Sequence, residues 1–144
     1  MAAKDTELKR MRDRALYEAY VRGLEGNSFE NMPQAIDFAR KQCAPQFFLS
    51  ARTASLYIAA AERGESLSSM NPGSRARVEK LREMYAEYRM EHPEDRRSRE
   101  LILEDLVELP APEFYIGYEM AKKIIFRERR KAQERMIAKW QGGF

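Results

Sequence analysis

The sequence predicts an all-α protein built from two consecutive three-helix units that pack as one compact domain. Three observations support this prediction. A short motif occurs twice, as CAPQFF at residues 43–48 and as PAPEFY at residues 110–115. Apolar residues recur at spacings of three and four along most of the chain, which is the period of an amphipathic helix. Extended segments are expected only at the short apolar runs 47–49 and 114–116.

Composition limits the kinds of protein that the chain can be. The 144 residues are 44% hydrophobic, which is enough for a core and argues against a disordered chain. One Cys and one His exclude an intramolecular disulfide and argue against a Cys- or His-based metal site. No signal peptide is visible, and no apolar run approaches the roughly 18 residues of a membrane span. We therefore expect a soluble, cytoplasmic protein with no membrane partner.

The internal repeat emerges when the sequence is compared with itself at an offset of 67 residues. Over residues 43–58 this comparison gives five identities in sixteen positions without a gap. The identical pairs are Ala44 and Ala111, Pro45 and Pro112, Phe47 and Phe114, Ala54 and Ala121, and Ile58 and Ile125. A repeat of this kind predicts that each copy is one structural unit. The alternative is that two similar turns arose by coincidence.

The first unit, residues 1–64, reads as three helices. The first runs over about residues 6–24, where apolar side chains keep helical spacing. The second follows Asn31, a good N-cap, and ends before Pro45, which cannot continue a helix. The third has Ser50 as its N-cap, and Gly64 favours a stop at its C-terminus.

A Ser-rich linker, residues 65–74, precedes the second unit, residues 75–144. The linker holds the turn string Asn-Pro-Gly. The first helix of the second unit follows it and ends at Pro93, and Ser98 caps the next helix. The last helix begins near Gly117 and continues almost to the end of the chain, with a long apolar stripe.

Each motif is interpreted as the hinge between the second and third helices of its unit. The Pro prevents helix continuation and pushes the preceding residue toward extended geometry. The aromatic residue two positions later then folds back into the core, and a small Ala lets the third helix pack closely. Cys43 takes the place of Pro110 and is expected to be small and buried. The structural positions are Pro45, Phe47, Leu49, Ala54, Ile58, Pro112, Phe114, Ile116, Ala121 and Ile125.

A short helix, a turn and a third helix that starts at a capped Ser resemble the helix-turn-helix superfamily of DNA-binding domains. Residues 35–42 and 50–54 carry the resemblance in the first copy, and residues 102–109 and 117–121 carry it in the second. The resemblance implies that each third helix enters the major groove and touches base edges with its early exposed side chains. One departure is the turn, which is about seven or eight residues long where the familiar motif uses three or four.

Charge is unevenly distributed in the second unit. Residues 122–139 carry eight basic side chains and two acids, a net charge of +6, whereas residues 91–113 carry eight acids and three Arg, a net charge of −5. A basic helix is a reasonable contact for phosphates. A solvated face that pairs with the acidic stretch, within the protein or across a dimer, explains the pattern as well. The candidate nucleic-acid contacts are Arg52, Ser55, Arg63, Lys122, Lys123, Arg127, Arg130 and Lys131.

These features favour a protein that binds double-stranded DNA, such as a small transcriptional regulator or a mobile-element or phage protein. We expect no enzyme activity and no cofactor. The sequence has no Ser/His/Asp arrangement, no Gly-rich phosphate loop and no metal-ligand spacing. The alternative is a helical protein–protein interaction or assembly module without affinity for nucleic acid. Homodimerisation stays open under either interpretation.

Overall fold

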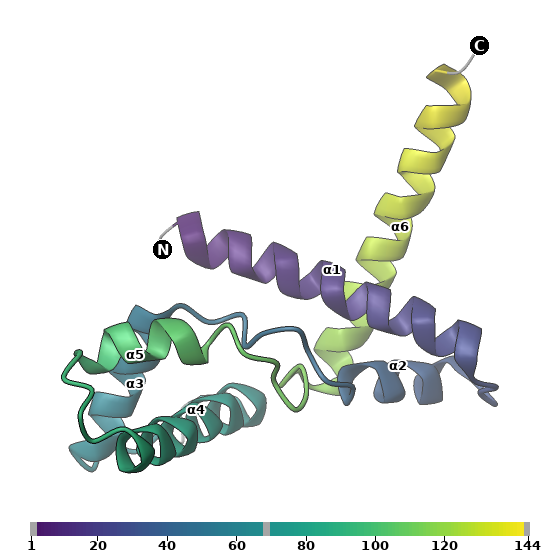
Figure 1. Cartoon of the computed structure of the whole chain (residues 1–144). Helices are drawn as coiled ribbons and strands as arrows, with labels where there is room; N and C mark the ends of the chain where they lie inside the picture. The colour runs from purple at the N-terminus through teal and green to yellow at the C-terminus, as the bar shows by residue number, and fades with distance from the viewer. Residues whose placement is uncertain (1–2, 68–69, 143–144) are drawn as a thin grey trace.

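The computed structural model describes residues 3–67 and 70–142, and the predicted all-α class is confirmed there (Figure 1). Residues 68–69 of the predicted linker, and the first and last two residues of the chain, lie outside the described residues. No helix in the described ranges has the length and apolar character to cross a membrane. The helices are α1 (Ala3–Gly26), α2 (Met32–Arg40), α3 (Ala51–Glu62), α4 (Pro72–Glu91), α5 (Arg99–Leu106) and α6 (Tyr118–Gly142).

Polar side chains start the four helices from α2 to α5. Each cap accepts a hydrogen bond from the backbone N–H three residues later, at 2.8–3.3 Å, and the caps are Asn31, Ser50, Asn71 and Ser98. Three of them are the predicted N-caps. Helix α4 begins earlier than predicted because Asn71 caps it and Pro72 suits its first turn. Gly64 follows α3 with a φ of +81°, the left-handed geometry of a helix stop.

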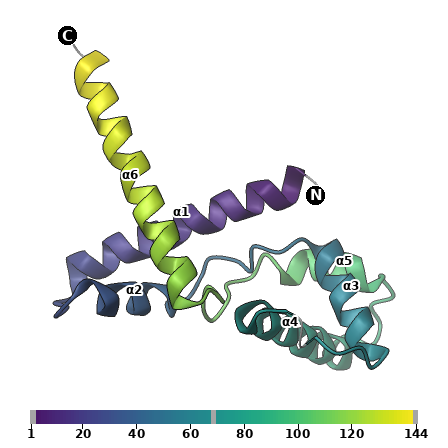
Figure 2. The same ribbon diagram turned by 180° about the vertical axis from the view of Figure 1, so that it is seen from behind.

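The six helices form two bundles (Figures 1 and 2). One bundle holds α1, α2 and α6, and the other holds α3, α4 and α5. Each bundle therefore takes two helices from one half of the chain and its third helix from the other half. The predicted arrangement of two consecutive three-helix units is not confirmed, because α3 and α6 are exchanged. The long connections explain the exchange, since the segments before α3 and α6 carry the chain from one bundle to the other.

The exchange takes place where the two motifs cross. Ala44 N–H donates to the carbonyl of Ala111 at 3.0 Å, and Ala111 N–H donates to the carbonyl of Ala44 at 2.9 Å. On either side, Phe47 N–H donates to the carbonyl of Val107 at 3.0 Å, and Phe114 N–H donates to that of Arg40 at 3.2 Å. The two bonds of each pair are related by the repeat. If each residue is replaced by its counterpart 67 positions away, the first bond becomes the second. The crossing therefore has an approximate two-fold axis between the two Ala residues.

An unusual backbone turn leads from the crossing into each third helix. Phe48 and Tyr115 have φ angles of +53° and +58°, which are uncommon for residues with a side chain. Such geometry costs about 1–3 kcal/mol per residue and needs surrounding contacts to maintain it. Those contacts are aromatic stacks across the axis. The Phe48 ring centroid lies 6.5 Å from that of Phe114, and the Phe47 centroid lies 6.2 Å from that of Tyr115.

The motif positions divide into buried side chains and exposed prolines. The Phe, Ala and Ile positions of the motif are buried, whereas Leu49 and Tyr115 are half-buried. Pro45 and Pro112 are exposed, so they act through their backbone geometry. The prediction of a buried Cys43 is wrong because that side chain is exposed. Side chains alternate along an extended segment, and burial of Ala44 turns its neighbour outward.

Replacing Ala44 by Leu should destabilise the whole protein. Ala44 and Ala111 are each 1% exposed at the crossing, so a larger side chain would force the two segments apart. We expect the free energy of unfolding to fall by about 1–3 kcal/mol. Circular dichroism recorded during unfolding in urea measures this free energy. Cys43→Leu adds the same side chain to the exposed neighbour and should change stability by less than about 0.5 kcal/mol. Equal losses in the two variants would contradict the close crossing.

Candidate nucleic-acid interface

Helix α6 has a buried first part and a projecting second part. Ala121, Ile124 and Ile125 are fully buried in the bundle with α1 and α2. From Phe126 onward the described side chains are exposed or half-buried, and the helix extends well beyond the bundle (Figures 1 and 2). The apolar stripe seen in the sequence is therefore buried only at its start. Residues 126–141 are called the α6 arm below.

Basic side chains surround the α6 arm. Arg129, Arg130 and Lys131 are consecutive and exposed, and successive helical residues point about 100° apart. Three sides of the helix therefore carry positive charge within one turn. Arg135 and Lys139 extend this charge toward the end of the arm, and both are exposed. Among the described residues, neither Arg129 nor Arg130 forms an ion pair.

Some of the predicted contact residues have partners inside the chain. Arg127 Nη2 donates to a carboxylate oxygen of Asp13 on α1 at 2.5 Å, and Asp13 is only 8% exposed. Lys131 Nζ pairs with Glu128 at 3.2 Å, within α6. Lys122 is half-buried, with its Nζ 5.9 Å from the Phe126 ring centroid. Arg127 thus fastens α6 to α1, while Lys123 and Arg130 are exposed.

The candidates on α3 lie in the other bundle. Arg52 is exposed but lines a cavity of about 380 Å³ together with Asp5, Glu100 and Glu104, whose charges disfavour a phosphate. Ser55 is half-buried. Arg63 Nη2 pairs with Glu65 at 3.4 Å. The structure therefore does not bring the α3 candidates and the α6 arm into one surface (Figure 1).

Three exposed basic residues of the arm, Arg129, Arg135 and Lys139, were not among the predicted contacts. They contribute to the net charge of +6 over residues 122–139. The positive charge continues beyond Ile124 and Ile125, the last buried apolar pair of α6, and this continuation is the signal that could have identified the three residues. Without the bundle, however, the sequence does not show where burial of α6 ends.

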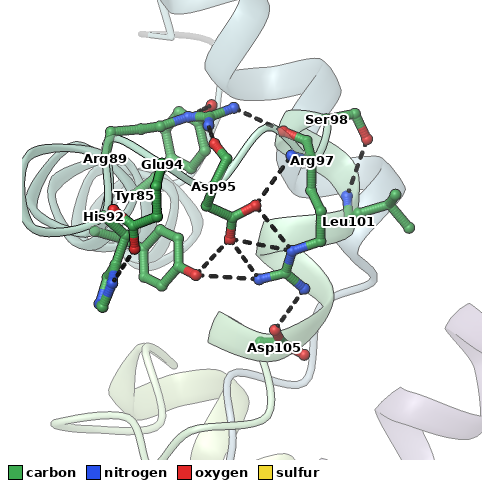
Figure 3. Close-up of polar contacts among 10 residues, drawn as sticks. Tyr85, Arg89, His92, Glu94, Asp95, Arg97, Ser98, Leu101 and Asp105 are labelled. Atoms are coloured by element: carbon green, nitrogen blue, oxygen red, sulfur yellow. Dashed lines mark hydrogen bonds and ion pairs between the residues drawn. The ribbon is translucent and has the colours of Figure 1, made fainter.

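The loop between α4 and α5 holds a dense polar network (Figure 3). Tyr88 OH donates to the Asp95 carboxylate at 2.5 Å, and Arg97 donates to it from its backbone N–H at 3.0 Å and from Nη2 at 2.9 Å. Arg89 donates to the carbonyls of Asp95 and Arg97 at 2.7 and 2.8 Å. The Asp95 side chain is only 14% exposed. Bonds from Arg97 and Tyr88 hold the pKa of the Asp95 carboxyl well below its usual range. Arg97 also pairs with Asp105 of α5 at 2.9 Å, so the network fixes the loop against that helix.

Asp95→Asn should lower the midpoint of thermal unfolding at neutral pH, because it replaces a charged acceptor of several hydrogen bonds. A carboxyl whose pKa is depressed by folding stabilises the folded protein above its unfolded pKa of about 4, and this contribution is lost as the pH falls. The difference in midpoint between wild type and variant should therefore shrink at acid pH. Melting curves over a pH series measure this. Glu94→Gln is the control, because this side chain is 72% exposed and its pair with His92 at 3.3 Å is a surface pair, so the midpoint should change much less than in Asp95→Asn. A pH-independent difference would contradict the assigned role.

Asp13→Asn should destabilise the protein by about 1–3 kcal/mol, because it leaves Arg12 and Arg127 without their shared carboxylate. Glu18→Gln on the same helix is the matched control. Its pair with Arg14 at 3.4 Å is exposed, and such pairs contribute about 0–1 kcal/mol. Urea unfolding of both variants gives the comparison. Similar values for the two would show that Asp13 does not fasten α6 to α1.

No protein-family model, curated protein or solved structure matches this chain.

Proposed function

We propose that the protein binds double-stranded DNA through the α6 arm and has no catalytic activity. The observation that supports this proposal is the projection of a strongly basic helix away from the bundle that anchors it (Figure 1). Phosphate neutralisation by Lys and Arg supplies most of the affinity in such complexes. The anchor at Ile124 and Ile125 would keep the arm helical as it approaches the duplex.

The distribution of charge around the arm favours a groove over a flat surface. The major groove is about 12 Å wide and admits one α-helix, with a phosphate backbone on each side. A helix in the groove can therefore use basic side chains on opposite sides at once. Arg129 and Lys131 point about 160° apart around the axis, and Arg130 lies between them. On a flat anionic surface only one of these sides would be in contact.

This mode of binding differs from the one that the helix-turn-helix resemblance implies. The early exposed positions of α6 are Glu119 and Met120, which are poor phosphate contacts. The proposal therefore moves the DNA contact from the start of the third helix to its second half. A role as a small transcriptional regulator or a mobile-element protein would follow from DNA binding of this kind.

We also propose that the two halves of the chain are copies of one helical unit. Helices α2 and α5 begin 67 residues apart, as do α3 and α6. The hydrogen bonds and aromatic stacks at the crossing are related by the same offset. The copies differ in their third helices, since α6 is longer and carries the basic arm, so the proposed DNA contact belongs to one copy only.

A helical assembly module is the second candidate function. Met136, Ile137 and Trp140 are 64%, 57% and 68% exposed on the arm, and these apolar side chains are suited to contact protein. The arm of one molecule would then meet the acidic α5 of another. A salt-sensitive oligomer seen by light scattering, combined with no affinity for DNA at low salt, would favour this function.

Replacing Arg129, Arg130 and Lys131 by Ala should weaken binding to a duplex without unfolding the protein. We expect the dissociation constant at low salt to rise by about 10- to 100-fold. The slope of log K against log salt should lose about 0.9 for each phosphate contact removed. Fluorescence anisotropy with a labelled duplex at several salt concentrations measures both quantities.

The matched control removes three exposed basic side chains from other helices and loops, with Arg22, Arg82 and Arg96 replaced by Ala. The change in net charge is the same, so this control separates a local contact from a general effect of charge. Equal weakening by the two triple variants would argue against the arm as the contact. Absence of binding by the wild-type protein at low salt would exclude the proposed function.

A further inference from the structure

A second concentration of positive charge lies between the two bundles, in a cavity of about 300 Å³ bounded by the first half of α1 and the starts of α3 and α4. Three basic side chains line it, Lys9 and Arg12 from α1 and Arg77 from α4. Asp5 is the single acid in the lining. Hydroxyl groups that can donate hydrogen bonds complete the polar lining, from Thr53, Tyr57 and Ser74.

Arg77 is a partly buried cation without an anionic partner. Its Nη1 donates to the carbonyls of Phe47 and Phe48 at 3.3 and 3.4 Å, which braces the crossing. Its Nε is buried and has no hydrogen-bond partner. No carboxylate in the described part of the chain pairs with it. Burial and the nearby charge of Arg12 lower the pKa of Arg77 to about 10, so the guanidinium is still charged at neutral pH.

Arg12 is also incompletely neutralised. It donates from Nε and Nη2 to one oxygen of Asp13 at 3.1 and 2.9 Å, and Arg127 takes the other oxygen of the same carboxylate at 2.5 Å. One negative charge is therefore shared between two guanidinium groups. Charges removed from water are costly unless they are paired. An anion in the cavity would supply the charge that Arg12 and Arg77 lack.

We propose that this cavity binds a phosphate group held by Lys9, Arg12 and Arg77. Charge-assisted hydrogen bonds from Arg and Lys are the usual means of holding a phosphate, and the positive end of α4 adds to them. The phosphate can come from a free small molecule or from a nucleic-acid backbone. In either case it would join α1 of one bundle to α4 of the other. The site is separate from the α6 arm and does not require that the arm bind DNA.

The first test uses inorganic phosphate and the full-length protein. Phosphate at about ten times its dissociation constant should raise the midpoint of thermal unfolding by about 5 °C, relative to sodium chloride at the same ionic strength. Calorimetric titration with phosphate gives the dissociation constant directly. No difference between phosphate and chloride, together with no heat of binding, would overturn the proposal.

Matched variants locate the site. Lys9→Gln and Arg77→Gln should each weaken phosphate binding about tenfold or more. Arg10→Gln removes an exposed charge next to Lys9, at a residue that does not line the cavity, and should leave affinity unchanged. Arg77→Gln also removes the hydrogen bonds from Arg77 to the crossing and can therefore fail to fold. In that case the comparison of Lys9→Gln with Arg10→Gln tests the site. Equal affinities for these two variants would overturn the proposal.

A competition experiment distinguishes the two sources of phosphate. If the cavity takes a backbone phosphate of DNA, Lys9→Gln should weaken duplex binding, and free phosphate should compete with DNA more than chloride at the same ionic strength. If the cavity takes a free small phosphate, duplex binding by Lys9→Gln should match that of Arg10→Gln. The phosphate titration contains no DNA, so its outcome is independent of the proposed function.

Discussion

The paired hydrogen bonds between Ala44 and Ala111 mark the point on which the rest of the structure depends. The chain crosses itself there, and each half buries its third helix against the first two helices of the other half. Ile58 of α3 is fully buried in the bundle of α4 and α5, and Ile125 of α6 is fully buried in that of α1 and α2. Each core is therefore completed by a helix from the other half. Loss of one bundle removes a helix from the other, so the two should unfold together.

The sequence predicts the helices well because their signals are local. N-caps such as Asn31 and Ser98 and the apolar spacing are read from a few neighbouring residues. The exchange of third helices could not be predicted in this way. Periodicity shows which face of a helix is apolar but does not show which helices cover it, and Ala54 and Ile58 have identical counterparts in Ala121 and Ile125. The long turn was the one local sign, because a connection of three or four residues could not reach the other bundle.

The candidate site was predictable only in part, for a related reason. The basic character of residues 122–139 is visible in the sequence, but the division of α6 into anchor and arm is not. Apolar residues continue past Ile125 to Trp140, so the stripe gives no sign that α1 and α2 cover only its start. No local pattern in the sequence indicates the phosphate cavity. Lys9 and Arg77 are far apart in sequence, and each alone is an ordinary charged residue of a helix.

Helix α1 connects the two concentrations of positive charge. Its Asp13 pairs with Arg127 at the base of the arm and with Arg12 beside the cavity. An anion bound next to Arg12 would compete with Asp13 for that guanidinium, leaving more of the carboxylate charge to Arg127. The ion pair that fastens α6 to α1 would then be stronger. Phosphate in the cavity would therefore strengthen the attachment of α6 to α1, and that attachment would favour phosphate in return, because such coupling is reciprocal.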